Sequence, residues 1–211
     1  MKAPELLHHA QRLQALAQNG ITYAVNPYDL ERYLEIREIS AKLLQELTDE
    51  PFEKILRVFT QETGYQTPKI DIRAVVFRDG KEILLVREKL DHNRWTLPGG
   101  WADIGYSPTE VAVKEVHEEA GLLVKPSRLL ALLDKAKHAH PPEPAYAYKA
   151  FIRCEVIGGD LTQETTETAG AAWFTQDAIS GLELSVDRVT QEQLDMFFMF
   201  LANPELPALC D

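Results

Sequence analysis

The sequence predicts an α+β fold, in which a small all-helical N-terminal domain precedes a mixed sheet that lies between helical layers. In the first 66 residues, apolar side chains recur at intervals of three and four, as one face of a helix requires. From residue 70 the pattern changes to short apolar runs bounded by glycine-containing turns, with further helical segments between them. We therefore expect a helical domain over residues 1–66, a larger domain over 67–205 and a tail over 206–211.

The N-terminal domain is expected to contain three helices. The first ends at Asn19-Gly20, a pair typical of helix ends, and the second begins at Asn26-Pro27. Pro51 separates the second helix from a third over residues 52–59. Apolar helices without a large core of their own need a surface to pack against. We expect a homodimer contact, packing on the larger domain, or both; a simple helical cap is the alternative.

The larger domain is expected to contain strands and two C-terminal helices. The strands are expected at residues 70–77, 82–88, 122–133, 146–157 and 171–174. Asp79-Gly80 and Gly158-Gly159 are expected to form turns. Helices are expected over residues 175–181 and 186–202.

Between two of these strands, a glycine-rich loop leads into another helix. Ser107 is the expected N-cap, Pro108 suits the first helical position, and Glu110 completes a capping box with Ser107. Gly121 is the expected C-cap, because glycine readily adopts a positive φ. The sequence thus predicts a helix over residues 108–120.

This helix carries three acids on one face, Glu115, Glu118 and Glu119. Like charges at this spacing repel one another, and a divalent cation would offset the repulsion. Carboxylate oxygens suit Mg²⁺ or Mn²⁺. A solvated acidic face is the alternative. The preceding glycine pair, Gly99-Gly100, favours the metal site because it lets the backbone approach a ligand closely.

Residues 100–122 resemble the Nudix box, in which a glycine is followed at fixed spacing by a glutamate and then by R-E-x-x-E-E-x-G and an aliphatic residue. The residues that match are Gly100, Glu115, Glu118, Glu119, Gly121 and Leu122. Tyr106 stands where the box usually has glutamate, and Lys114 stands where it has arginine. Lys114 keeps the positive charge but loses the planar fork that orients a carboxylate through two hydrogen bonds.

The resemblance implies a Nudix α/β/α sandwich that hydrolyses a nucleoside diphosphate linked to another group X. It implies that the three helix acids bind Mg²⁺ or Mn²⁺, helped by the Gly99 carbonyl, with Lys114 beside them. It also implies a general base, which is either a box glutamate, such as Glu115 or Glu118, or an acid on a later loop. On that loop Glu167 is our first choice and Glu164 the second; an ordinary polar loop is the alternative.

A helical N-terminal region before a box written GGWADIGYSP…VKEV resembles a bacterial subgroup of Nudix proteins. Members of that subgroup have been described as ADP-ribose or CDP-choline pyrophosphatases, so we expect a small nucleotide of this kind as substrate. Two alternatives remain: a protein that senses nucleotide sugars without hydrolysing them, and a hydrolase of nucleoside triphosphates or RNA ends.

Basic side chains outside the box are candidates for binding substrate phosphates. Lys135, Lys137 and His138 lie together in one loop of an otherwise acidic chain. An inert loop, or a metal site at His138 and His140, would also account for them. Two strand residues, Arg73 and Arg87, are further candidates for substrate contacts, although either could be an ordinary surface residue.

Net charge, apolar runs and cysteine number limit the classes of binding partner and the cellular location that we expect. A net charge of −11 argues against nucleic acid as the main ligand, because binding to its backbone depends on clustered Lys and Arg. No apolar run approaches the roughly 20 residues that cross a bilayer, and the N-terminus has no signal-peptide pattern. With only 2 cysteines, far apart, we expect a cytoplasmic protein with free thiols.

Overall fold

The computed structural model describes residues 3–211, and the chain divides into two compact units. The first unit comprises Met1–Lys69 together with Pro141–Tyr146, and the second comprises Ile70–His140 and Ala147–Asp211. Each unit has a hydrophobic core of its own. Within the described residues, every helix is too short or too polar to span a membrane.

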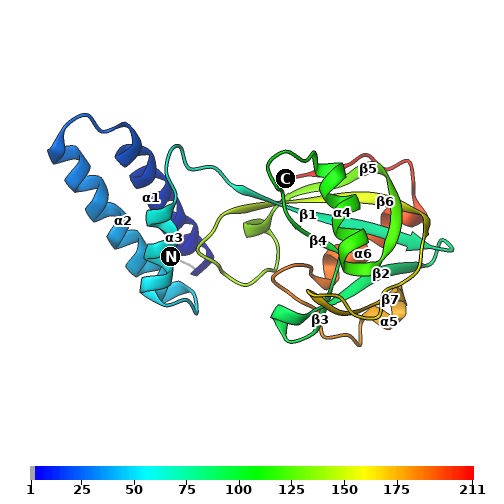
Figure 1. The fold of residues 1–211 in the computed structure, drawn as a ribbon. Helices are drawn as coiled ribbons and strands as arrows, with labels where there is room; N and C mark the ends of the chain where they lie inside the picture. Colours follow the sequence, from blue (N-terminus) through cyan, green and yellow to red (C-terminus); the bar gives the residue numbers. More distant parts are fainter. Residues whose placement is uncertain (1–2) are drawn as a thin grey trace. The chain divides into compact units, whose positions relative to one another are not determined.

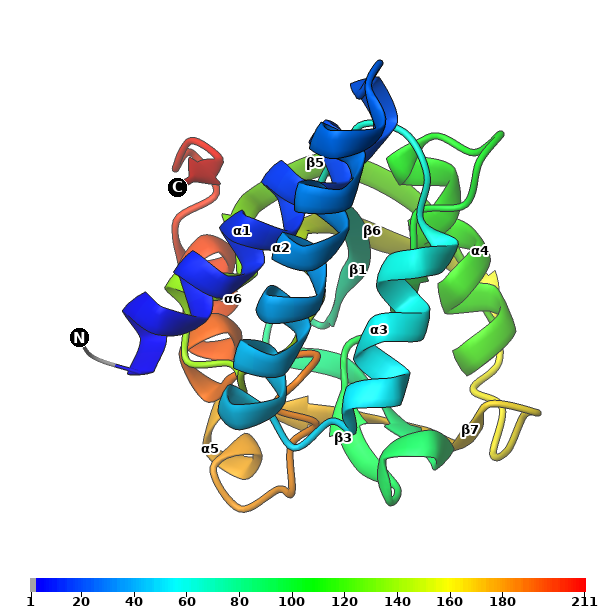
Figure 2. The same cartoon turned by 90° about the vertical axis from the view of Figure 1, so that its left-hand side faces the viewer.

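The first unit is built on three helices that lie side by side (Figures 1 and 2). They are α1 (Ala3–Tyr23), α2 (Pro27–Leu47) and α3 (Phe52–Gln61). The N-cap of α2 is Asn26, whose side chain accepts a hydrogen bond from the Asp29 N–H, as its sequence predicts. The core between the helices consists of Ala10, Ala41, Leu44, Ile55 and Phe59.

The predicted end of α1 at Asn19-Gly20 is wrong, because the helix continues through this pair to Tyr23. A Cβ atom on Gly20 would lie 2.3 Å from the aromatic ring of Tyr33 on α2. The glycine therefore lets two helices approach closely, and the tertiary contact outweighs the local tendency of Asn-Gly to end a helix.

A segment distant in sequence folds with the three helices. The side-chain amide of Gln11 donates to the Glu143 carbonyl at 2.9 Å, and the Lys69 N–H donates to the Tyr146 carbonyl at 2.9 Å. The segment Pro141–Tyr146 thus belongs to the helical unit, although it connects two strands of the other unit. Hydrophobic periodicity could not indicate this, because the contacts join one side-chain amide and main-chain groups.

The second unit contains a mixed sheet. Its strands are β1 (Lys69–Arg78), β2 (Glu82–Glu88), β3 (Arg94–Thr96), β4 (Gly99–Trp101), β5 (Leu122–Asp134), β6 (Ala147–Gly159), β7 (Thr168–Thr175) and β8 (Leu209–Cys210). The strand order is β3-β2-β1-β6-β5-β8, with β4 paired to β1 and β7 paired to β2. The pairing of β8 with β5 is parallel, whereas β2 is antiparallel to β1, β3 and β7.

Helices cover both faces of this sheet (Figure 1). On one face α4 (Pro108–Ala120) packs through Ala112, Val116 and Ala120 against strand residues such as Ile72 and Val76. On the other face α6 (Gln191–Ala202) contributes Leu194, Phe197 and Phe200 to a second core layer. Short helices α5 (Gln176–Ile179), η1 (Lys89–Asp91) and η2 (Lys135–Lys137) complete the unit. The predicted mixed sheet between helical layers, after a helical N-terminal region, is confirmed.

Two local expectations for this unit are wrong. The helix expected over residues 186–202 begins only at Gln191, because Thr190 and Gln193 form a capping box there. Gly158 and Gly159 do not form a turn; they lie in β6, opposite the start of β5. A Cβ atom on Gly159 would lie 2.6 Å from the Gly121 carbonyl oxygen, so this glycine permits close strand pairing.

The tail expected over residues 206–211 contains a strand. Leu209 and Cys210 of β8 pair with Ala131 and Leu132 of β5. A two-residue strand is too short to show a period, and its hydrogen bonds depend on an edge that only the folded sheet provides.

Candidate active site

The helix α4 begins and ends as its sequence predicts. The Ser107 side chain accepts a hydrogen bond from the Glu110 N–H, and the Glu110 carboxylate accepts one from the Ser107 N–H at 2.7 Å. At the other end Gly121 has φ +76° and donates its N–H to the His117 carbonyl. These caps fix the position of the three acids along the helix.

Glu119 is buried and is held by the glycine turn. Its carboxylate accepts a hydrogen bond of 2.9 Å from the Gly99 N–H, and burial raises its pKa to about 8. Gly99 has φ +148°, and a Cβ atom there would lie 2.0 Å from the Ile72 carbonyl oxygen. Only glycine allows this approach to β1. The sequence singled out the Gly99 carbonyl, whereas the structure brings the Gly99 N–H to the acid.

Glu115 lies one turn earlier on the helix and faces Gly100. A Cβ atom on Gly100 would lie 3.4 Å from Glu115 Oε1, so the second glycine leaves room beside this carboxylate. Burial raises the pKa of Glu115, and the charges of Glu118 and Glu167 raise it further. Glu118 is the open member of the set, with its side chain 56% exposed.

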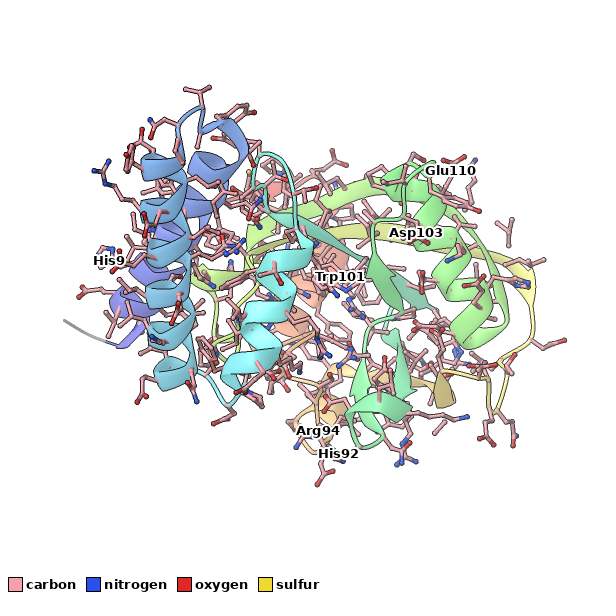
Figure 3. The ribbon with its side chains drawn as sticks, turned by 60° about the vertical axis from the view of Figure 1, so that its left-hand side comes forward. His9, His92, Arg94, Trp101, Asp103 and Glu110 are labelled. Atoms are coloured by element: carbon pink, nitrogen blue, oxygen red, sulfur yellow. The ribbon has the colours of Figure 1, made fainter. Side chains whose placement is uncertain are left out.

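Lys114 joins the acids. Its Nζ lies 3.4 Å from carboxylate oxygens of both Glu115 and Glu118, and 3.3 Å from Asp103. Burial lowers the pKa of Lys114, but these three carboxylates together raise it above its ordinary value. Asp103, on the loop that precedes α4, was not singled out in the sequence (Figure 3). Its contact joins this irregular loop to Lys114, eleven positions later in α4, which no periodic pattern could indicate.

The donor set fits a hard divalent cation. Two carboxylates, Glu115 and Glu119, are buried with raised pKa values, and a bound cation would favour their charged forms. Gly100 leaves space beside Glu115. As the side chains are placed, however, no three acidic, histidine or cysteine groups within residues 3–211 are close enough to hold an ion.

The two candidate general bases on the loop before β7, Glu164 and Glu167, have different neighbours. Glu164 is paired with Lys89 at 2.8 Å, and this hydrogen bond lowers the pKa of Glu164. The charge of Glu167, in contrast, raises the pKa of Glu115. The buried Thr168 hydroxyl donates to the Glu119 carbonyl at 2.8 Å, so the loop is fastened to the last turn of α4.

The basic candidates are dispersed. Arg87 lies over the Trp95 ring at 5.5 Å, and His138 contacts Asp211 at 3.0 Å. Lys135 is buried and its neighbour Lys137 is exposed, both in η2. The alternative of a histidine metal site has no support in the placement of His140. Its Nδ1 lies 2.6 Å from the Val186 carbonyl oxygen, and its Nε2 lies 3.0 Å from the Gln193 side-chain nitrogen.

Arg73 is buried, and its contacts lie inside the protein. Its Nε donates to Asp71 at 2.9 Å and its Nη1 donates to the Leu97 carbonyl at 3.1 Å. Asp71 also contacts Lys149, a fully buried lysine that the sequence analysis missed because it lies within an apolar strand pattern. Arg73 is close enough to Glu119 for its positive charge to lower the pKa of that acid.

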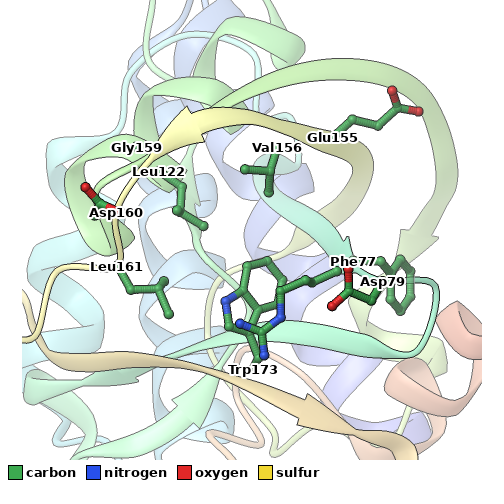
Figure 4. A pocket seen from close by; sticks show the side chains of 10 residues that line it. Phe77, Asp79, Leu122, Glu155, Val156, Gly159, Asp160, Leu161 and Trp173 are labelled. Carbon is green, nitrogen blue, oxygen red and sulfur yellow. The ribbon is translucent and has the colours of Figure 1, made fainter.

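A separate pocket of about 620 Å³ lies elsewhere in the second unit (Figure 4). It is lined by Phe77, Arg78, Asp79, Leu122, Glu155, Val156, Gly159, Asp160, Leu161 and Trp173. None of these residues except Leu122 belongs to the Nudix box, and none is an expected catalytic, metal-binding or substrate-binding residue. We therefore place the candidate active site at the acids of α4 and the glycine turn.

Comparison with protein families covers both units. Residues 4–59 match a family described as a UDP-X-like, N-terminal oligomerisation domain, and residues 67–196 match the NUDIX domain. The chain is a Nudix hydrolase. This confirms the resemblance that the box residues indicated.

Three similar proteins match this chain, two of them over almost its whole length. This Nudix hydrolase is 44% identical over 205 residues to the "Putative ADP-ribose pyrophosphatase YjhB" of Bacillus subtilis (strain 168), covering 97% of this chain and 96% of that protein. It is 37% identical to an ADP-ribose pyrophosphatase from Streptococcus suis 89-1591, with a TM-score of 0.60 over 69% of this chain and 100% of the other. A crystal structure of a UDP-X diphosphatase is 31% identical, with a TM-score of 0.62 over both full chains.

Proposed function

We propose that this Nudix hydrolase is a metal-dependent pyrophosphatase that acts on ADP-ribose or a similar nucleoside diphosphate linked to X. The products are a nucleoside monophosphate and phospho-X. The observation that carries the proposal is the pair of buried carboxylates, Glu115 and Glu119, set against two glycines at the start of β4. Relatives described as acting on ADP-ribose and on UDP-X support the class of substrate.

We propose Mg²⁺ or Mn²⁺ as the cofactor, with Glu115, Glu118 and Glu119 as ligands and the Gly99 carbonyl beside them. When bound, such a cation offsets charge on the diphosphate and lowers the pKa of a coordinated water. The protein contributes two buried acids whose position is fixed by the caps of α4 and by the Gly99 N–H. Lys114, between Glu115 and Glu118, limits the repulsion between those two carboxylates.

Glu167 is the proposed general base. It accepts a proton from the attacking water as the water oxygen bonds to one phosphorus and the P–O bond to the leaving phosphate breaks. Glu167 suits this role better than Glu164, because Glu164 is engaged by Lys89. Lys135, Lys137, His138 and Arg87 stay as proposed contacts for the substrate. Arg73 is not retained as one, because its contacts lie inside the protein.

We also propose a homodimer formed through the helical unit. The matching family is described as an oligomerisation domain, and this unit exposes apolar side chains, among them Leu30 and Leu34 at adjacent turns of α2. Apolar side chains exposed on one helix face favour contact with another protein surface.

A substrate panel tests the reaction. The full-length protein is incubated with ADP-ribose, a UDP-sugar, CDP-choline and nucleoside triphosphates, with Mg²⁺, with Mn²⁺ and after EDTA treatment. We expect monophosphate release from a diphosphate-linked substrate with either cation and none with EDTA. Pyrophosphate from triphosphates would instead indicate a triphosphate hydrolase, and ADP-ribose binding without turnover would indicate a sensor. No turnover on any substrate would contradict the proposed function.

A further inference from the structure

We propose that a buried ion cluster of Asp71, Arg73 and Lys149 is a positioning device that holds the Leu97–Gly99 turn and, through it, the carboxylate of Glu119. The inference rests on the proposed function, in which Glu119 binds a divalent cation. It assigns roles to two residues, Asp71 and Lys149, outside the Nudix box. It also changes the role of Arg73 from substrate contact to support of the turn.

The cluster is buried and carries an excess of positive charge. The side chains of Asp71, Arg73 and Lys149 are 9%, 6% and 0% exposed. Asp71 accepts from Arg73 Nε at 2.9 Å through one carboxylate oxygen and contacts Lys149 Nζ through the other. The two positively charged side chains, Arg73 and Lys149, therefore share one carboxylate. Buried charges are costly without partners, so this arrangement favours a second anion nearby.

The guanidinium of Arg73 joins the cluster to the glycine turn. While Nε binds Asp71, Nη1 donates to the Leu97 carbonyl at 3.1 Å. The Ala74 N–H of the same strand donates to the Pro98 carbonyl at 2.8 Å, and Gly99 pairs directly with Arg73 in the β1–β4 ladder. Three successive residues of the turn are thus fastened to β1.

The glycine turn positions the Glu119 carboxylate. The Gly99 N–H donates to Glu119 Oε2 at 2.9 Å, and its direction depends on the turn because Gly99 has φ +148°. The positive charge of Arg73 also acts on the Glu119 carboxylate, which supplies the second anion that the cluster favours. One side chain, Arg73, therefore orients the donor and stabilises the charged acceptor.

The planar fork of Arg73 is the feature to test, because lysine retains the charge but presents a single ammonium group. In Arg73→Lys, that group cannot bind Asp71 and the Leu97 carbonyl with the same geometry. We expect the dissociation constant for Mn²⁺, measured by electron paramagnetic resonance on metal-free full-length protein, to rise about tenfold, in the range found for residues that orient metal ligands. We also expect the Gly99 amide to exchange hydrogen several times faster by NMR.

The matched control is Arg78→Lys, which makes the same change at the last residue of β1. Arg78 is paired with Glu82 and lies over the Trp173 ring, and neither contact involves the glycine turn or the acids of α4. We expect Mn²⁺ affinity and Gly99 exchange in this variant to match the parent. If Arg73→Lys does not fold, Asp71→Asn takes its place with the same expectations, because asparagine keeps the shape and one acceptor.

The outcomes separate the two proposals. If the parent does not bind Mn²⁺, or Glu119→Gln binds it as tightly as the parent, the proposed metal site fails. If Glu119→Gln weakens binding but the folded Arg73→Lys variant matches the parent in both Mn²⁺ affinity and Gly99 exchange, the positioning role fails. A purely structural cluster would lower the unfolding temperature of Arg73→Lys and leave both other measurements unchanged.

Discussion

Glu118 differs from its neighbours because it is half exposed, whereas Glu115 and Glu119 are buried. An exposed ligand can be neutralised with little effect on folding. We therefore expect Glu118→Gln to lower kcat on the active substrate by on the order of a hundredfold or more while the unfolding temperature stays near that of the parent. Glu110→Gln is the control on the same helix, since glutamine also serves in a capping box. A Glu118→Gln enzyme as active as the parent would contradict the proposed role of Glu118 as a metal ligand.

The two glutamates of the 160–167 loop offer a paired test of the general base. The charge of Glu167 raises the pKa of Glu115, whereas Glu164 is paired with Lys89. We expect Glu167→Gln to lower kcat by about 10²–10⁴, the usual contribution of a general base, and Glu164→Gln to change it by less than about threefold. Steady-state kinetics on the same substrate decides between them. The reverse order of effects would assign the base to Glu164.

At the scale of elements, the joint between α4 and β5 depends on Gly121. Its φ is +76°, and a Cβ atom there would lie 2.2 Å from Thr162 Oγ1 and 2.6 Å from the Asp160 carbonyl oxygen. Gly80, with φ +64°, has nothing within 4 Å of the same position. Gly80→Ala should therefore lower the free energy of unfolding by about 1–2 kcal/mol, because alanine is strained in the left-handed conformation. Gly121→Ala should lower it by a further amount of about 1–3 kcal/mol, because the new methyl group overpacks the site.

Urea unfolding followed by tryptophan fluorescence measures this difference, because all three tryptophans lie in the second unit. Equal losses of stability in the two variants would show that the close packing at Gly121 relaxes without cost.

His140 follows the loop that contains Lys135 and Lys137, and it contacts Gln193 of α6. It should make the stability of the protein depend on pH. Burial lowers its pKa from 6.5 to about 4, helped by the positive charges of Lys149, Lys135 and His138. Between these two values the unfolded chain binds a proton that the folded protein does not. The free energy of unfolding should therefore fall as the pH falls from 6.5 towards 4.

His140→Gln keeps a donor for the Val186 carbonyl and an acceptor for Gln193 but does not titrate. Urea midpoints at pH 7 and pH 5 test the assignment. We expect the decrease between these conditions to be smaller in the variant than in the parent. An equal decrease would mean that other groups cause it.

At the scale of the whole molecule, the helical unit is proposed to join two copies. Leu34 is 41% exposed on α2, and a charge there would have to be buried in a dimer contact. We expect light scattering to give twice the chain mass of 23.9 kDa for the parent and a concentration-dependent shift towards one chain for Leu34→Glu. Ile157→Glu, the same kind of change in the second unit, should leave the mass unchanged. A parent of single-chain mass would contradict the homodimer.

Local chemistry explains which predictions are confirmed. The caps of α4 are short-range hydrogen bonds between Ser107, Glu110 and the backbone, so a few adjacent residues determine them. The errors have another origin. Gly20 packs against Tyr33 and Gly159 against Gly121, and in each case a segment distant in sequence requires the residue to be glycine.

The sequence by itself determined the α+β order of elements, the bounds of the acidic helix and the membership of the Nudix family, because periodicity, caps and fixed spacing are written in neighbouring residues. Only the tertiary structure decided that Arg73 contacts the glycine turn, that Lys149 lies buried beside Asp71, and that Pro141–Tyr146 folds with the helices. Each of these contacts joins segments far apart in the chain, and the burial that makes their charges and hydrogen bonds matter exists only after the chain has folded.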